Sequence, residues 1–296
     1  VFNRAYEALL FDVARVPYPA AGAEQACLDA LEAHCRRGDA AAFIAEPLVL
    51  WRQLGTAQGD VRGDVRGGSG LGLYIADQLA RRLGATLSFQ RGELLADVLE
   101  TLREGGDPVL ERYGSALQAT PAKWIGYLSS TGVYGDTGGA WVDESAPIGG
   151  GRRSARAAAD LEWQKLRDDV SVFRLPGIYG PGRSALDRVR EGKAHRIDIP
   201  DQVFSRVHVD DIVSGIVASF AGPSGIYNLA DNLPCSQNSV IEFACILLGM
   251  QPPLLQTLEE AQLSPMAAAF YAENRRVSNL KAQRLLGWKP DYPDYK

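Results

Sequence analysis

The stretch Leu128-Ser129-Ser130-Thr131-Gly132-Val133-Tyr134-Gly135 decides the fold of this chain. It completes an apolar run, Trp124 to Ser130, that stops on small and hydroxylated residues. A second apolar run, Val170 to Leu175, stops in the same way on Pro176 and Gly177. Buried strands of a parallel sheet end like this at the edge where α/β proteins bind their ligands. The two runs therefore predict an α/β fold with a ligand site at their carboxyl ends.

Helical patterns separate these strands, as a parallel sheet requires of its crossover connections. The expected helices cover residues 108–117, 155–166, 212–220, 240–248 and 280–286, and a short strand is expected over 226–229. Alternating strands and helices of this length indicate βαβ units. We expect a partial Rossmann-like, doubly wound parallel sheet with a small C-terminal substrate lobe.

Composition and charge exclude several classes of partner. The chain has 296 residues and a net charge of −5 with both signs interspersed, so nucleic acid and anionic membranes are poor partners. No apolar run approaches the roughly 20 residues that span a bilayer. The four cysteines fit no zinc motif, and no signal peptide is visible. These features predict a cytoplasmic protein without a metal site; they do not fix its oligomeric state.

Hydroxyl groups at the end of the first strand are candidates for catalysis. A serine at the lip of a sheet can hydrogen-bond a substrate oxygen where charge develops. Ser130 is the first candidate, with Ser129 and Thr131 as its neighbours. The same hydroxyls can instead cap a helix or form a turn, and the residues alone leave both roles open.

The loop after the second strand, Pro176-Gly177-Ile178, is a candidate for binding a planar ligand, because proline removes a donor and glycine allows close backbone approach. A plain turn is the alternative. His208, Asp210 and Asp211 form a weak metal pattern, and we expect them to cap the next helix and fix the loop.

Taken in order, these strings resemble the extended short-chain dehydrogenase/reductase family, the NAD(P)-dependent epimerases and dehydratases of sugar nucleotides. Ser130, four residues before Tyr134, takes the place of the catalytic serine. Pro176-Gly177-Ile178 is similar to the loop that meets the nicotinamide, and Ser129 joins this cofactor set. The resemblance covers roughly residues 105–296. It implies an oxidoreductase or epimerase that uses NAD or NADP on a hydroxyl-bearing small molecule such as a nucleotide sugar.

One departure from the family concerns its acid–base pair, a tyrosine and a lysine four residues apart. Counting back from Asp160 on the helix 155–166 places Arg156 and Arg152 at those positions, and no tyrosine lies between Gly149 and Lys165. Arginine stays protonated at ordinary pH and is a poor proton shuttle. Arg152 and Arg156 are predicted to hold an anionic group or to form a solvated helix face.

Residues 51–92 contain a glycine-rich turn that supports two interpretations. Gly70 and Gly72 could lie under a cofactor pyrophosphate at a helix N-terminus, although no apolar strand precedes them. The string Gly67 to Ile75 also resembles the last glycine box of a histidine-kinase ATPase domain, which implies ATP instead.

Residues 1–50 resemble a fragment of a class III aminotransferase, through the string Gly38 to Val49. We therefore divide the chain into three parts: 1–50, 51–92, and a dehydrogenase/epimerase-like domain over 93–296. A chain assembled from three such unlike parts, a mosaic, has an alternative function to that of an enzyme: it could be a non-catalytic nucleotide-binding module or an inactive remnant.

Overall fold

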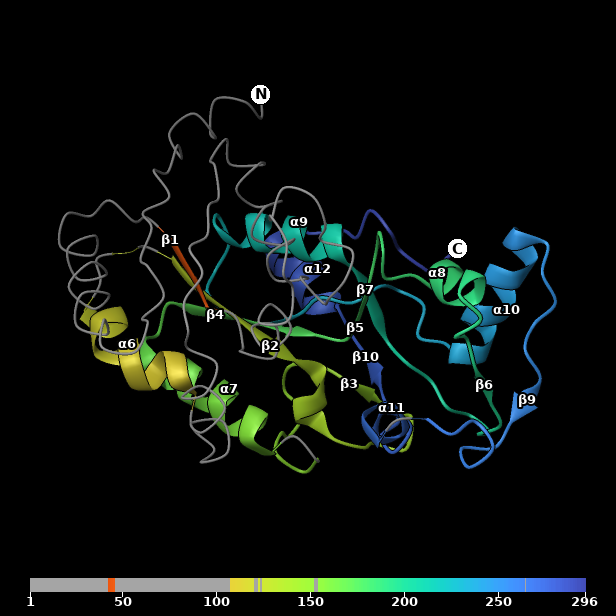
Figure 1. Cartoon of the computed structure of the whole chain (residues 1–296). Coiled ribbons are helices and arrows are strands. Elements are labelled where there is room, and N and C mark those ends of the chain that lie inside the picture. Colours follow the sequence, from red (N-terminus) through yellow and green to blue (C-terminus); the bar gives the residue numbers. More distant parts are fainter. Residues whose placement is uncertain (1–41, 46–106, 120–121, 123, 152–153, 264) are drawn as a thin grey trace, which may run out of the picture. The chain divides into compact units, whose positions relative to one another are not determined.

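The computed structural model describes residues 42–45, 107–119, 122, 124–151, 154–263 and 265–296 (Figure 1). Most of the predicted parts 1–50 and 51–92 lie outside these ranges. So do Gly70, Gly72 and Arg152 and the helix expected to follow the glycine-rich turn. The mosaic hypothesis stays a prediction. Within the described part, no helix is long and apolar enough to cross a membrane.

A four-stranded sheet organises the described part of the chain. Its order is β1 (Ala42–Ala45), β2 (Trp124–Ser130), β4 (Val170–Leu175) and β8 (Gly225–Asn228). Strand β1 runs parallel to β2. Helix α7 (Ser154–Leu166) connects β2 to β4, which is the crossover that parallel neighbours need. The predicted α/β class with a Rossmann-like parallel sheet is confirmed.

Contacts along the chain divide it into two units, and the first includes residues 107–129 and 158–172. Its helix α6 (Pro108–Ala119) begins where the Asp107 carboxylate accepts the N–H of Val109 at 2.9 Å. The second carboxylate oxygen of Asp107 accepts the indole N–H of Trp163 at 3.1 Å. The Trp163 ring stacks on Tyr127 with 4.9 Å between ring centres. A buried aromatic pair and a shared carboxylate thus tie α6, β2 and α7 together.

The second unit holds residues 130–157, 173–222 and 226–296. Three two-stranded parallel sheets stabilise its described part. They pair β3 (Trp141–Val142) with β10 (Arg276–Val277), β5 (Gly177–Tyr179) with β7 (Arg206–His208), and β6 (Arg196–Ile197) with β9 (Leu255–Gln256). The helical elements are a 3-10 turn (Thr131–Tyr134), α8 (Ala185–Arg190), α9 (Val209–Ser219), α10 (Gln237–Leu248), α11 (Pro265–Phe270) and α12 (Leu280–Leu286).

The start of α9 confirms the role predicted for the His208 region. His208 is the N-cap, and its Nδ1 accepts the N–H of Asp210 at 3.2 Å. The Asp211 carboxylate accepts the N–H groups of Asp291 and Tyr292 at 2.6 and 3.1 Å, which fixes the C-terminal segment on this helix. Burial lowers the pKa of His208, so its ring is a neutral acceptor at neutral pH.

Candidate functional site

The turn after β2 is held by its own side chains. The Ser130 hydroxyl accepts the N–H of Gly132 at 3.1 Å and so caps the 3-10 turn. Thr131 is buried. The turn ends at Gly135, where φ is +71° and a Cβ atom would lie 2.9 Å from the backbone N of Gly151. Only glycine fits there without strain. The capping role left open for Ser130 is therefore observed, and its catalytic role stays a prediction.

Ser129 lies in the first unit and faces a buried acid. Its hydroxyl donates to the Asp160 carboxylate at 2.5 Å, and both residues are buried. Gln164, one turn further along α7, also donates to Asp160 at 2.6 Å. Ser129 therefore anchors α7 to β2, and this bond defines what its hydroxyl does in the structure.

Behind the turn lies a buried polar cluster formed by Tyr134, Arg174 and Asn228. The Tyr134 hydroxyl accepts from Arg174 Nη1 at 3.0 Å and donates to Asn228 Oδ1 at 2.8 Å. The Arg174 guanidinium also lies 5.0 Å from the centre of the Tyr134 ring. Burial raises the pKa of Tyr134 despite the nearby guanidinium, so the phenol stays protonated and continues to donate.

The segment entering α7 is bonded to the same turn. The N–H of Gly149 donates to the carbonyl of Val133 at 2.9 Å, and Gly151 packs against Gly135. This contact brings the start of α7, with half-buried Arg156 in its first turn, beside the Ser130 turn. Ser130, Thr131 and Arg156 thus belong to two segments that the structure joins.

A second arginine braces the turn from the C-terminal part of the chain. Arg275 Nη1 donates to the Gly135 carbonyl at 2.6 Å and pairs with the Glu273 carboxylate at 2.9 Å. Glu273 is buried and approaches Gly151, where a Cβ atom would lie 3.0 Å from Glu273 Oε1. The geometry of the turn therefore depends on residues about 140 positions away in sequence.

The loop after β4 forms strand β5 beside β7. Gly177 donates its N–H to the Ser205 carbonyl at 3.2 Å, and Ile178 pairs with Val207. The Tyr179 hydroxyl donates to the Asp294 carbonyl at 3.2 Å. Pro176, Gly177 and Ile178 are not buried. The loop is thus fixed on one side by backbone pairing and is accessible on the other.

The role of these loop residues in holding a planar cofactor ring stays a prediction. Gly177 is exposed, and a Cβ atom placed on it would lie 3.4 Å from the Ser205 carbonyl oxygen and 3.9 Å from Arg206 Cγ, which are ordinary contacts. Pro176 brings no N–H that would need a partner. In the described part of the chain, no group of three histidine, cysteine or acidic residues could hold a metal ion.

Sequence reasoning missed the cluster of Tyr134, Arg174 and Asn228 and the brace formed by Glu273 and Arg275. Arg174 gave a usable signal, because an arginine inside an apolar strand must find partners when it is buried. The sequence offered no signal for Arg275, whose partner Gly135 is reached only through the fold.

No protein-family model matches the sequence. A search of curated proteins finds a 3-diazoavenalumate denitrifying reductase from Streptomyces, 29% identical over 70% of this chain and 68% of that protein. Among solved structures, a putative NAD-dependent epimerase/dehydratase from Methylobacillus flagellatus is 21% identical with a TM-score of 0.54, over 86% of this chain and 94% of that one. Neighbours with the same fold were solved with UDP-glucose and NAD, or with NADPH. The fold is therefore that of NAD-dependent epimerase/dehydratase-like short-chain dehydrogenases. Neither search gives evidence for the kinase or aminotransferase resemblance.

The chain is also similar, in both sequence and structure, to a conserved protein of unknown function from Silicibacter pomeroyi. The two share 34% identity with a TM-score of 0.65, over 86% of this chain and 95% of that one. At that identity and coverage, the chain belongs to the same family as the Silicibacter pomeroyi protein, within the epimerase/dehydratase-like fold.

Proposed function

We propose that this chain is an NAD(P)-dependent reductase of the short-chain dehydrogenase type. It would reduce an oxygen-bearing or other polar group of a small molecule. One observation carries the proposal. The Ser130 turn and the Pro176–Ile178 loop follow β2 and β4, which are neighbours in the sheet. Ligands of doubly wound sheets bind outside the carboxyl ends of such strands. The Streptomyces relative, a reductase by name, supports the direction of the reaction.

The proposed roles follow from the chemistry of the side chains. A bound nicotinamide cofactor would supply the hydride, and Pro176, Gly177 and Ile178 would hold its ring. Ser130 and Thr131 would orient the substrate. Arg156, together with Arg152, would stabilise negative charge that develops on the substrate, because a guanidinium remains cationic throughout.

Reduction is favoured over epimerisation because the two described tyrosines of this turn and of the loop after β4 already have hydrogen-bond partners. The aligned helix positions carry arginine. Tyr134 donates to Asn228, and Tyr179 donates to the Asp294 carbonyl. A proton from water can complete a reduction, whereas nicotinamide-dependent epimerisation begins with oxidation of a hydroxyl group, in which the cofactor would take the hydride and a base must take the hydroxyl proton. Nucleotide sugars are the first substrates to test, because a fold neighbour was solved with UDP-glucose.

Cofactor binding tests the proposal directly. We expect NADH or NADPH to bind the whole chain, followed by nucleotide fluorescence. Gly177→Val adds a branched side chain to the loop and should weaken that binding by about tenfold or more. Gly114→Val is the matched control, because a Cβ atom at Gly114 meets no atom within 4 Å. Equal affinity of the two variants would contradict the site.

Absence of binding by either nicotinamide cofactor at about 1 mM, a free energy near −4 kcal/mol, would remove the reductase assignment. The non-catalytic alternative would then stand. Thermal stabilisation by Mg-ATP without stabilisation by NADH would instead support the kinase-like interpretation of the glycine-rich turn.

The arginine role has its own test once a substrate is found. Arg156→Met should lower kcat/KM by about 10²-fold, the usual cost of removing a group that stabilises transition-state charge. Arg190→Met, on the exposed face of α8, is the control and should be neutral. The pH profile of the wild-type chain should be flat between about pH 6 and 9, because arginine does not titrate there. A basic limb in that range would show a proton shuttle that we have not identified.

A further inference from the structure

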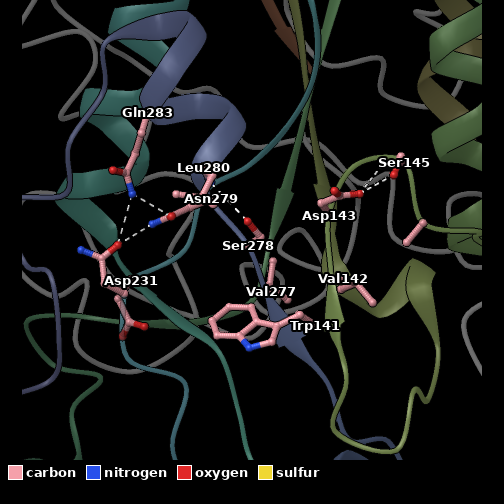
Figure 2. Close-up of a pocket in the computed structure, with 12 residues that line it drawn as sticks. Trp141, Val142, Asp143, Ser145, Asp231, Val277, Ser278, Asn279, Leu280 and Gln283 are labelled. Carbon is pink, nitrogen blue, oxygen red and sulfur yellow. Dashed lines mark hydrogen bonds between the residues drawn. The ribbon is translucent and has the colours of Figure 1, made fainter.

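A pocket of about 690 Å³ opens in the second unit, and none of the described residues assigned to catalysis or cofactor binding is among those that line it. Figure 2 shows the side chains around it. They come from β3 and its following loop, from the residues after β8, and from β10 and α12. The polar and aromatic ones include Trp141, Asp143, Asp231, Asn232, Asn279 and Gln283. The pocket is thus a separate candidate site whose function does not depend on the proposed reductase.

An exposed tryptophan forms one side of this pocket. Trp141 has 60% of its surface accessible although it lies on strand β3. Its neighbour Val142 points into the core, where it packs with Val277 and Tyr134. The backbone of β3 is fixed by its pairing with β10. The indole is therefore a flat apolar surface on a rigid strand, available to stack against a ligand.

Three amide side chains line another side in a fixed arrangement. Asn279 donates to Asn232 Oδ1 at 2.9 Å and to the Ala230 carbonyl at 2.6 Å. Gln283 donates to Asn279 Oδ1 at 2.8 Å and to Asn232 Oδ1 at 3.3 Å. Figure 2 shows the bond between Gln283 and Asn279. The network holds the amides in place, and the amide nitrogen of Asn232 has no hydrogen-bond acceptor in the described part of the chain.

A buried carboxyl group provides the strongest indication of a ligand. Asp231 is only 2% exposed, and its Oδ1 accepts the N–H of Leu233 at 3.2 Å. Its Oδ2 has no hydrogen-bond partner among the described residues. A buried polar atom without a partner is costly, so a group that donates to it would be bound favourably.

We infer that this pocket binds a hydroxylated ring, a monosaccharide or a close polyol analogue, with the ring face on Trp141 and hydroxyl groups bonded to Asp231 and Asn232. A ring of C–H groups suits the indole face, and hydroxyls can donate to the carboxyl group and accept from the amide. The lining residues include Asp143 and Asp231 but no lysine or arginine. The pocket therefore selects neutral or amino sugars and rejects sugar phosphates.

The experiment uses the full chain and ligand-observed NMR with methyl glucoside, glucosamine and glucose 1-phosphate as probes. We expect saturable binding of one or both of the first two at about 1–10 mM, and at least about tenfold weaker binding of the phosphate. Trp141→Ala should weaken sugar binding about tenfold, because it removes the stacking surface. Leu254→Ala is the control, since it truncates an apolar side chain that is 83% exposed and lies outside the pocket.

A second variant keeps the test decisive if Trp141→Ala loses its fold, which circular dichroism would reveal. Asp231→Asn keeps the size of the side chain and an acceptor for the Leu233 N–H, and should weaken sugar binding several-fold. Absence of binding by both sugars, unchanged affinity in both variants, or tighter binding of the phosphate would each overturn the inference. None of these outcomes bears on NADH binding, which is measured separately.

Discussion

The turn after β2 and the pocket beside β3 lie in the same unit, but they differ in whether their buried polar groups have hydrogen-bond partners. In the turn, Ser130 caps its own backbone and Tyr134 both donates and accepts within the protein. In the pocket, Asp231 Oδ2 is buried with no partner among the described residues. These polar groups of the turn have partners within the protein, whereas Asp231 Oδ2 would gain a partner from a bound ligand.

This difference separates two kinds of site. Satisfied hydrogen bonds hold the Ser130 turn in one geometry, which is what a reaction needs from its positioning groups. The unsatisfied carboxyl group at Asp231 instead lowers stability until a ligand supplies a donor. Stability measurements should therefore respond in opposite directions when polar groups of the two regions are removed.

The largest effect is expected at Asp231 and depends on pH. Burial raises its pKa from 3.8 to about 7, with Asp294 and Asp211 adding to the rise and Arg206 opposing it. Between these values the folded state binds more protons than the unfolded state, so stability falls as pH rises from about 4 to about 7. Asp231→Asn removes this loss.

Urea unfolding of wild type and Asp231→Asn at about pH 5 and pH 8.5 measures the effect. The variant should gain on the order of 2–4 kcal/mol relative to wild type between the two pH values. Glu144, whose pKa is also raised by burial, is not among the groups that shift the pKa of Asp231, so its titration cancels in the difference. The same difference at both pH values would mean that Asp231 has a partner in solution.

The cluster behind the turn should respond in the opposite direction. Arg174→Met leaves the Tyr134 hydroxyl without its donor inside the core, and should cost about 2–3 kcal/mol of unfolding free energy. Tyr134→Phe removes two hydrogen bonds but keeps the ring, and should cost about 1–2 kcal/mol. The loss of unfolding free energy in the double variant should be smaller than the sum of the two single losses, because both single variants remove the same bond.

Additive losses in that double-mutant cycle would show that Arg174 and Tyr134 do not act together. A gain in stability in Arg174→Met would show that the hydrogen bond between Arg174 and Tyr134 does not stabilise the fold. Either result would remove the contrast between the turn and the pocket.

Local patterns predicted the main strands well. Strands β2 and β4 begin and end at the predicted residues, Trp124–Ser130 and Val170–Leu175, because each is a continuous buried apolar run ended by small residues or proline. The helix α12 also has its predicted bounds, since Gly287 adopts the left-handed conformation that ends it. Where a boundary is set by neighbouring residues, the sequence is sufficient.

Contacts between distant segments could not be predicted in the same way. Strands β3 and β10 have two residues each and exist only because they pair with each other across the chain. Asn228 lies 94 residues from its partner Tyr134, and Asp231 gains its burial only when β8, β7 and the C-terminal segment meet. Neither a two-residue strand nor a buried carboxyl group leaves a periodic pattern that could be read beforehand.

The smallest stability effect, at Ser130, is the most informative about function, because a matched serine exists. Ser130→Ala removes the cap on Gly132, and Ser236→Ala removes the cap that Ser236 provides to Ser239 at the start of α10. Each should cost about 1 kcal/mol in urea unfolding. If Ser130 only caps its turn, both variants keep the same activity; if it also orients substrate, Ser130→Ala alone loses about 10²-fold in kcat/KM. Ser130→Thr, which retains a hydroxyl group, should then recover part of that loss, and equal activity of the two alanine variants would leave Ser130 as a structural cap.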